Sequence, residues 1–144
     1  MNNVKVDFYL LNEADERLYY RAVCGFVQQT YQQTQALYIY TESVEQAHKM
    51  DQLLWTFNDI SFIPHSLETN EEKACMIWIG VGAHAKQFHP HAWLLNLTQT
   101  IGDFFMYFHR IIEFVPNCVK AKEQARKKYK QYKTKNLPLS VQNK

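Results

Sequence analysis

The chain has 144 residues, of which 47% are hydrophobic and 15% aromatic; this is enough apolar material for the core of one domain and excludes a disordered chain. Four glycines and four prolines are too few for an all-β sandwich with many tight turns, and no apolar run approaches the roughly 18 residues that a membrane span needs. The net charge of +2 conceals an uneven distribution: residues 1–116 carry 7 Lys and Arg against 13 Asp and Glu, whereas residues 117–144 carry 9 against 1.

The first 55 residues carry the pattern of two strand–helix pairs. Apolar residues alternate over residues 4–11, as in a strand, and then recur at helical spacing over residues 13–33. Residues 36–41 are apolar throughout, which is typical of a strand buried on both faces. Ser43 and Gln46 have the spacing of a capping box and open a helix that reaches Trp55. This order predicts an open, mostly parallel α/β sheet flanked by helices, of Rossmann-like form.

The middle of the chain predicts shorter segments. Apolar runs bounded by turn residues predict four more short strands, at residues 58–65, 75–80, 92–98 and 109–115. A polar, acidic loop is expected at 66–74 and a histidine-rich loop at 81–91. The aromatic stretch 101–108 predicts a turn or a short helix.

The C-terminal stretch predicts one basic helix over residues 117–135. Asn117 is a favourable N-cap after Pro116, and Asn136 and Pro138 mark the end of the helix. The last six residues are polar, and no packed structure is expected for them. We therefore expect one α/β domain over residues 1–138 and a polar tail over residues 139–144.

Nucleotide-binding motifs are incomplete in this sequence. Residues 80–85 fit the pattern G-x-G-x-x-A after a predicted strand, which resembles a dinucleotide-binding turn. That turn should open an amphipathic helix, but HAKQFHPH follows, and no acidic residue stands about 20 positions further on at a strand end. The phosphate-binding pattern G-x-x-x-x-G-K-[ST] does not occur. We therefore expect no nucleotide cofactor.

Histidines and cysteines do not form a recognisable metal or catalytic motif. Three histidines lie in one predicted loop without a carboxylate or cysteine close in sequence, so a polar loop is favoured over a metal site: His84, His89 and His91. Three widely spaced cysteines indicate a reducing cytoplasm rather than a disulfide framework: Cys24, Cys75 and Cys118. Without a legible catalytic set, an α/β domain of this kind is expected to be a binding module rather than an enzyme.

The predicted basic helix presents a row of cations beside a tyrosine. Lys122, Arg126, Lys130 and Lys133 follow one another at spacings of four, four and three residues, so they are neighbours on one side of a helix. Tyr129 lies beside this row. Charge runs are most often only solvated surfaces, but a surface that combines cations with an aromatic ring favours binding. Because the rest of the chain is net negative, this positively charged row is expected to bind an anionic partner.

Several stretches of the chain resemble the chi subunits of bacterial DNA polymerase III holoenzymes. They are the opening FYLL, MDQLLW at the end of the second predicted helix, SFIPH at residues 61–65, and FVP at residues 114–116 followed by ARKKYKQY at residues 125–132. These elements occur in the same order over nearly the whole chain. The combination of SFIPH with FVP and ARKKYKQY is specific, whereas neither part alone would be.

The resemblance implies a role as a non-catalytic accessory of the clamp loader in DNA replication. Members of this family have a fold like that of nucleotide-binding sheets but bind no nucleotide. One face binds the psi subunit, which tethers chi to the clamp loader, and another binds the acidic tail of single-stranded DNA-binding protein, which ends in phenylalanine. The contact with DNA would thus be indirect, without a membrane or cofactor, in the bacterial cytoplasm at the nucleoid-associated replisome.

Residues are assigned to these two surfaces by the same resemblance. The tail-binding site would comprise the basic row with an apolar floor: Val115, Lys122, Arg126, Tyr129, Lys130 and Lys133. The psi-binding site would comprise Trp55, Phe62 and Pro64, although the sequence pattern by itself favours the core for Trp55 and Phe62.

This chain departs from the family pattern near the tail-binding site. Lys133 stands where arginine is common, and Thr134-Lys-Asn-Leu137 replaces a glycine and an aromatic residue, with Leu137 as the candidate substitute. An alternative function is direct binding of single-stranded nucleic acid by the basic helix, because phosphates also suit a row of lysines. Such a groove usually offers several stacking rings, whereas this row has mainly Tyr129.

Overall fold

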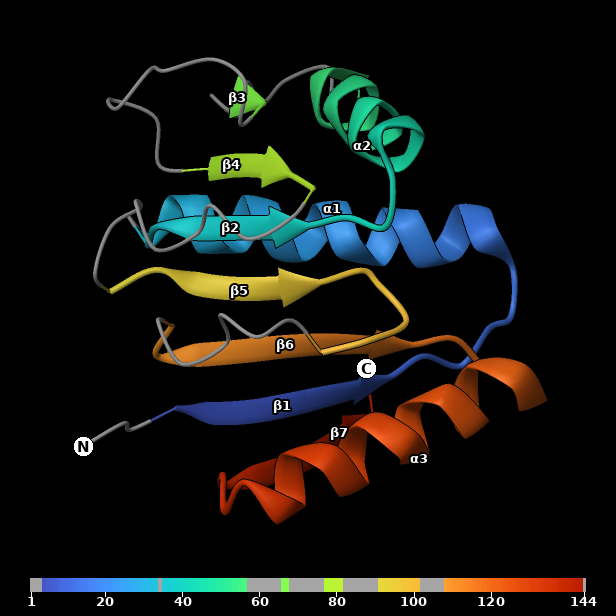
Figure 1. Ribbon diagram of the computed structural model, residues 1–144. Helices are drawn as coiled ribbons and strands as arrows, with labels where there is room; N and C mark the ends of the chain where they lie inside the picture. Colours follow the sequence, from blue (N-terminus) through green and yellow to red (C-terminus); the bar gives the residue numbers. More distant parts are fainter. Residues whose placement is uncertain are drawn as a thin grey trace.

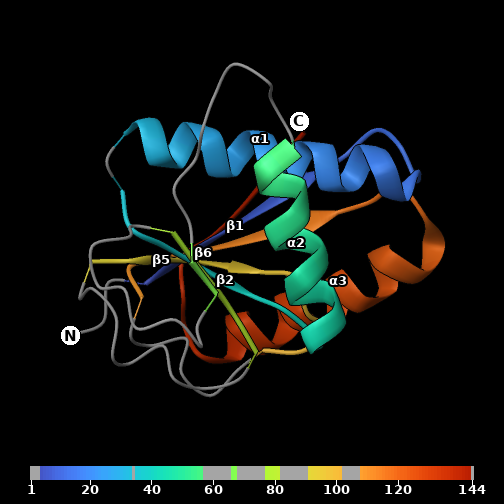
Figure 2. The ribbon, with the colours of Figure 1, turned by 90° about the horizontal axis from the view of Figure 1, so that it is seen from above.

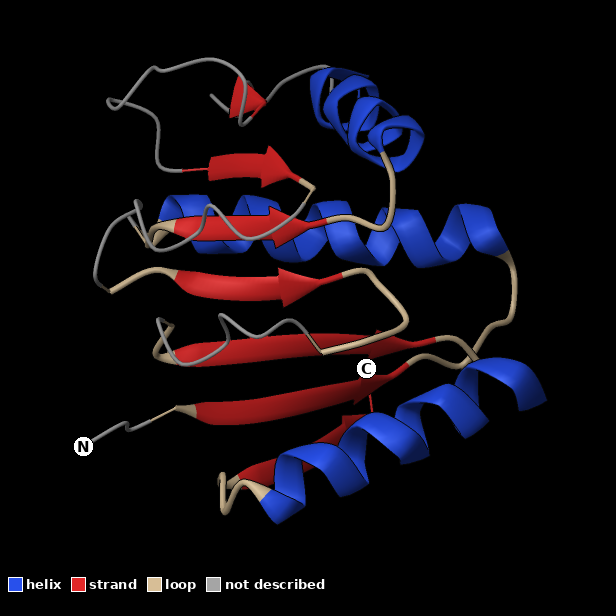
Figure 3. Ribbon diagram, in the orientation of Figure 1, coloured by secondary structure: helices blue, strands red, loops and turns tan. Residues whose placement is uncertain are grey.

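The computed structural model describes residues 4–33, 35–56, 66–67, 77–81, 91–101 and 108–143. Within these residues, seven parallel strands form one open sheet in the order β3-β4-β2-β5-β6-β1-β7 (Figures 1 and 3). The strands are β1 (Lys5–Leu10), β2 (Leu37–Tyr40), β3 (Ser66–Leu67), β4 (Ile77–Gly80), β5 (Trp93–Asn96), β6 (Arg110–Val115) and β7 (Leu139–Asn143). The prediction of an open, Rossmann-like α/β sheet is confirmed.

The three helices of the described residues cover the two faces of the sheet. Helices α1 (Glu16–Gln32) and α2 (Val44–Thr56) pack on one face, and α3 (Val119–Thr134) packs on the other (Figure 2). Two hydrophobic clusters result, one under each helix layer. The alternation of β1 shows how: Val6 and Phe8 face α3, whereas Tyr9 faces α1. None of the described helices is long and apolar enough to cross a membrane.

The predicted capping box at the start of α2 is present. The backbone N–H of Gln46 donates to the Ser43 hydroxyl at 3.1 Å, and the backbone N–H of Ala47 donates to the Ser43 carbonyl at 3.0 Å. The Gln46 side chain accepts from the backbone N–H of Glu42 at 2.7 Å, one residue earlier than in the usual reciprocal arrangement. These bonds satisfy donors that would otherwise be unpaired at the start of the helix.

Helix α3 begins two residues later than expected, and Asn117 is not its N-cap. The N-cap is Cys118, whose side chain makes no capping hydrogen bond. Asn117 instead ties the end of β6 to the loop after β1, because its side-chain amide donates to the Asn12 carbonyl at 3.1 Å and its backbone N–H to the Glu13 carbonyl at 3.0 Å. The asparagine therefore joins two segments that are distant in sequence.

The polar tail expected beyond residue 138 is a strand in the structure. Leu139–Asn143 form β7, which pairs in parallel with β1 at the edge of the sheet. Local polarity misled the prediction because an edge strand is exposed on one side, and its backbone partner lies more than a hundred residues earlier in the sequence. The loop expected to begin at residue 66 likewise begins with the short strand β3.

A tight reversal after α3 places β7 beside β1. Asn136 adopts φ 60°, the left-handed conformation that follows many helices. The N–H of Leu137 bonds to the Tyr132 carbonyl at 3.4 Å, and the N–H of Asn136 to the Lys133 carbonyl at 3.0 Å. This pair of bonds is a Schellman motif, with the accompanying apolar contact supplied by Leu137 and Tyr132 in the same cluster.

Candidate functional site: the basic flank of the last helix

The structure places the predicted row of cations on one exposed flank of α3. The side chains that form this basic flank are all exposed: Lys122, Arg126, Lys130 and Lys133. Within the described part of the chain, none of them forms an ion pair. Four uncompensated cations along about three turns of helix create a positive field that attracts anions.

Tyr129 lies at the border between the basic flank and the core. Its ring is half-buried and packs on Phe8 of β1, with ring centroids 5.8 Å apart. Because the ring is held on one side by the sheet, only its other parts face the solvent beside Arg126 and Lys133. A partly exposed, fixed aromatic ring next to cations is suited to contact an apolar side chain of a partner.

Strand β7 extends this apolar surface to the edge of the sheet. Val141 is paired with Phe8, and Asn143 with Leu10. Since Phe8 and Leu10 belong to the cluster under α3, the side chain of Val141 lies on the same face of the sheet, where it is 52% exposed. Leu10, Tyr129 and Val141 thus form an apolar strip beside the basic flank. Sequence reasoning missed Val141 because it assigned this segment to an unpacked tail.

A buried polar network fixes α3 on the sheet. Lys128 is only 8% exposed, and its ammonium donates to Glu113 Oε1 at 2.8 Å and to the Thr98 carbonyl. Glu113 Oε2 accepts from the Tyr132 hydroxyl at 2.7 Å and from the Asn96 amide at 2.8 Å. Burial, and then the charge of Glu113, raise the pKa of the Tyr132 hydroxyl far above its ordinary value. The network joins α3 to β5 and β6.

The network determines which lysines face the solvent. Lys128 is one turn from Tyr132 and three residues from Ala125, so it lies on the inner side of the helix with them. With that side held against Glu113, Arg126 and Lys133 are turned outward. Helical spacing groups Lys128 with Ala125 and Tyr132, but the sequence did not indicate its partner Glu113 on β6, so its burial was not predicted.

Val115 lies beneath the first turns of α3 rather than on the basic flank. It is 4% exposed, belongs to the cluster under α3 and is paired with Leu10 of β1. With Ala121 and Ala125 it lines a cavity of about 220 Å³ at the carboxyl end of the sheet. The resemblance assigns Val115 to the apolar floor of the tail-binding site. Because its side chain is buried, it can contribute to that floor only through its neighbour Leu10.

A second surface lies at the end of α2. Trp55 is 49% exposed there, which is unusual for so large an apolar side chain, and the core position favoured by its sequence pattern is wrong. Phe62 and Pro64, which were assigned to the same surface, lie outside the described residues. The sequence could not separate these options, because a tryptophan at helical spacing is equally compatible with a core.

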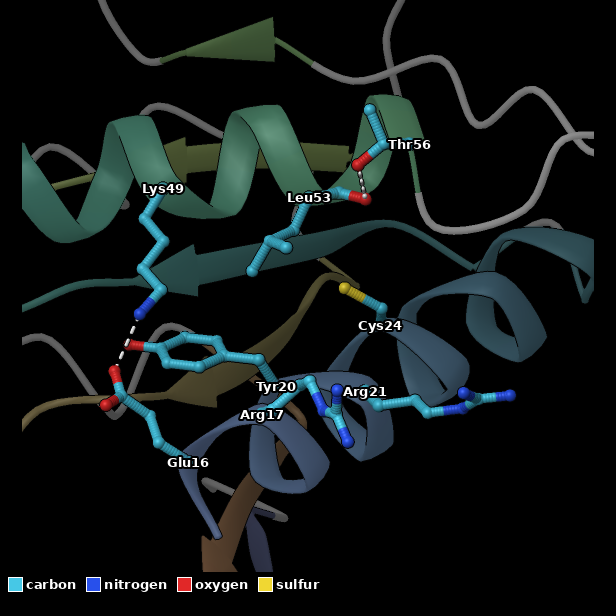
Figure 4. Close-up of a pocket in the computed structure, with 8 residues that line it drawn as sticks. All are labelled: Glu16, Arg17, Tyr20, Arg21, Cys24, Lys49, Leu53 and Thr56. Carbon is cyan, nitrogen blue, oxygen red and sulfur yellow. Dashed lines mark hydrogen bonds and ion pairs between the residues drawn. The ribbon is translucent and has the colours of Figure 1, made fainter.

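A cavity of about 360 Å³ lies between α1 and α2, and its lining includes Leu53 and Thr56, which flank Trp55 in the sequence (Figure 4). Leu53 and Cys24 are among its apolar lining, and the ion pair between Lys49 and Glu16, 2.6 Å long, bridges the two helices. Lys49 also lies 4.5 Å from the centre of the Tyr20 ring. These contacts join the exposed sides of α1 and α2.

The described residues hold no cluster of possible metal ligands at these two surfaces. No group of three or more possible metal ligands occurs among them. Cys24 is buried, and burial raises the pKa of its thiol to about 11, which disfavours the reactive thiolate. His84, His89 and Cys75 lie outside the described residues. The arrangement of α3 and β7 sets exposed cations beside partly exposed apolar side chains, a combination that favours binding of an anionic partner.

Comparisons with known proteins cover nearly the whole chain. Residues 3–140 match the family model described as DNA polymerase III chi subunit, HolC. The chain is 30% identical to DNA polymerase III subunit chi of Haemophilus influenzae over 140 residues, covering 94% of each chain. It is 28% identical to the protein of that name in Pseudomonas aeruginosa over 135 residues, covering 94% of this chain and 93% of the relative. A third relative of that name, from Escherichia coli, is 25% identical over 119 residues, covering 83% and 81%.

Proposed function

Because the chain belongs to the family of DNA polymerase III chi subunits, we propose that it links the clamp loader to single-stranded DNA-binding protein during replication. In this proposal the chain has no catalytic centre of its own. It binds the psi subunit on one surface and the acidic C-terminal tail of single-stranded DNA-binding protein on another, and it works in the bacterial cytoplasm at the replisome. The observation that carries the proposal is the basic flank of α3, whose cations form no ion pair within the described residues, beside a partly exposed apolar strip.

The acidic tail would bind along the basic flank. Aspartates of the tail would face Lys122, Lys130 and Lys133, and Arg126 would hold the terminal carboxylate with two parallel hydrogen bonds. The terminal phenylalanine ring would rest on the apolar strip of Leu10, Tyr129 and Val141. A contact of this size, largely electrostatic and at the surface, is expected to be weak and sensitive to salt.

The psi subunit would bind at the end of α2. Trp55 provides a large exposed anchor, and Phe62 and Pro64 follow it in the chain. Aromatic anchors of this type contribute a large share of the binding energy at protein interfaces. The basic flank lies on α3, on the opposite face of the sheet from α2, so both partners can be bound at once.

The tail-binding proposal is tested by fluorescence anisotropy with a labelled acidic peptide that ends in phenylalanine. The native chain is expected to bind it, and Arg126→Ala and Lys130→Ala should each weaken binding by about tenfold, the loss expected for one charge-assisted contact. Lys127→Ala is a matched control, because Lys127 is equally exposed on the same helix but lies on the other flank. A peptide without the phenylalanine should bind poorly.

The apolar strip is tested separately in the same assay. Val141→Asp should weaken binding by about tenfold, since it puts a charge where the ring would rest and repels the aspartates. Val44→Asp introduces the same change at an exposed valine on α2 and should leave binding unchanged. Equal effects of the two substitutions would show that the strip is not part of the site.

Labelled oligo-dT distinguishes the adaptor function from direct binding of nucleic acid. The adaptor function predicts binding of the peptide and little binding of oligo-dT at the same salt concentration. If oligo-dT binds as well as the peptide, and the terminal phenylalanine is irrelevant, the basic flank is a nucleic-acid surface.

A further inference from the structure

Two histidines from separate loops meet at the amino end of the sheet. His91 precedes β5 and His109 precedes β6, and these two strands are neighbours. The backbone on both sides is fixed: the His109 N–H donates to the Ala92 carbonyl at 3.3 Å, and the Gln35 side chain donates to the His91 carbonyl at 2.6 Å. The pairing of β5 with β6 therefore holds the two imidazoles together, although they are 18 residues apart.

The imidazoles face each other through one nitrogen each. Nδ1 of His91 lies 2.9 Å from Nε2 of His109, and the ring centroids are 4.8 Å apart with an angle of 34° between the planes. Both side chains are exposed, so solvent has access to the two nitrogens. Without another ligand, one ring donates its N–H to the other.

We propose that His91 and His109 form a binding site for a divalent transition metal ion such as Zn²⁺, Ni²⁺ or Cu²⁺. Imidazole is the commonest protein ligand of these ions. Two nitrogens bound to one tetrahedral Zn²⁺, each at about 2.0 Å, lie roughly 3.3 Å apart, so the two nitrogens need to separate by only a few tenths of an ångström. Both rings must also turn, so that their lone pairs point to the metal instead of at each other, and as exposed side chains they have room to do so.

The described residues supply two ligands to the metal. Among the described residues no third histidine, cysteine or carboxylate completes the pair. Two protein ligands suit a labile ion that binds in the micromolar range rather than a structural zinc centre, which uses four. Neither histidine belongs to α2 or α3, the two helices that carry the described residues Trp55 and the basic flank.

Isothermal titration with Zn²⁺ and Ni²⁺ tests the proposal on the full chain after treatment with a chelator. The native chain is expected to bind one ion, and His91→Gln and His109→Gln should each weaken binding at least tenfold. The Gln side chain keeps a hydrogen-bonding amide, so loss of the pair's hydrogen bond alone would not explain the effect. His48→Gln, at a single exposed histidine on α2, is the matched control and should bind like the native chain.

Electron paramagnetic resonance of the Cu²⁺ complex provides a second readout. Coupling to two imidazole nitrogens is expected in the native chain and to fewer in either variant. Circular dichroism of the metal-free variants establishes that they are folded. The proposal is overturned if the native chain binds no ion, or if the variant with both substitutions binds as tightly as the native chain, which would place the ion on other groups.

Discussion

Lys128 shows that a lysine within a run of basic residues need not be a surface charge. Six of its neighbours between residues 120 and 133 are Lys or Arg, and composition alone would assign all of them the same role. Its ammonium is instead buried and forms an ion pair with the Glu113 carboxylate. The same carboxylate also accepts a hydrogen bond from the Tyr132 hydroxyl. A buried ion pair adds little net stability over apolar packing, but removal of one partner leaves the other charge without compensation.

Lys128→Met is therefore expected to lower the free energy of unfolding by about 3–5 kcal/mol, because Glu113 would stay buried without its cation. Urea denaturation measures this change. Lys127→Met removes an exposed charge at the adjacent position and should change stability by less than about 0.5 kcal/mol. Similar results for the two variants would mean that the buried pair does not hold α3 on the sheet.

Cys24 gives the protein a specific dependence on alkaline pH. Burial raises the pKa of its thiol from 9.0 to about 11 in the folded chain. The neutral thiol therefore stabilises the fold fully below pH 9.0, and this contribution is lost as the pH rises from 9.0 towards 11, because the unfolded chain loses its proton first. The loss amounts to roughly 2 kcal/mol.

Urea titrations of the free energy of unfolding between pH 8 and 11 check this expectation. Cys24→Ala should have a shallower fall than the native chain, with a remainder from Tyr132, whose pKa is also raised. Cys118→Ala removes an exposed thiol and should retain the full dependence. An equal fall in Cys24→Ala and in the native chain would contradict a buried, protonated thiol.

Among the elements, the end of α3 determines where β7 begins. The Schellman motif stops the helix at Thr134 and reverses the chain at Asn136, so that Leu139 reaches its partner Val6 on β1. Glycine is the usual residue in this left-handed position, because it has no side chain to clash with the backbone. Asparagine tolerates the conformation at a small cost.

Substitutions at Asn136 should follow this conformational preference. Asn136→Gly is expected to leave the stability unchanged or raise it slightly, whereas Asn136→Ala should cost about 1 kcal/mol. Thermal unfolding measures both. Gln131→Ala, an exposed position inside α3, is the control and should have little effect. A neutral Asn136→Ala would indicate that the reversal does not depend on a left-handed residue.

The helices and central strands were predictable because their patterns are local. Helical spacing and a capping box are contained in the segments themselves, and both are present in α2. Strand β7 was not predictable, because the pattern of Leu139 and Val141 is too short and its partner β1 is remote in sequence. For the same reason the sequence indicated the basic row of the candidate site, but not Val141 beside it or the burial of Lys128.

At the scale of the whole molecule, the charges are separated between one helix and the rest of the chain. The basic segment of residues 117–144 carries 9 cations and 1 anion, against a net negative charge in the remainder. Such a distribution orients an acidic partner towards α3 before contact and speeds its association. The acidic body repels the same partner elsewhere on the surface.

Affinity for the acidic peptide should therefore fall by about tenfold between 0.05 M and 0.5 M salt, because added ions screen the exposed cations. Anisotropy titrations over this range measure the slope. Arg126→Ala should give a shallower slope than the native chain, and a peptide with its aspartates replaced by asparagines should be nearly insensitive to salt. An affinity that does not change with salt would assign the binding to apolar contact alone.

The position of β1 has a consequence for the synthesis of the protein. Among the described strands β1 is the first to be synthesised, yet its two neighbours in the sheet are β6 and β7, which are synthesised after all the others. Lys5 pairs with Arg110, and Val6 with Leu139, so β1 has no sheet partner until most of the chain has been translated. Pairings of such long sequence separation form slowly. The nascent chain thus exposes the apolar strand β1 until β6 and β7 have been made, which makes it a natural client for chaperones that act on emerging chains.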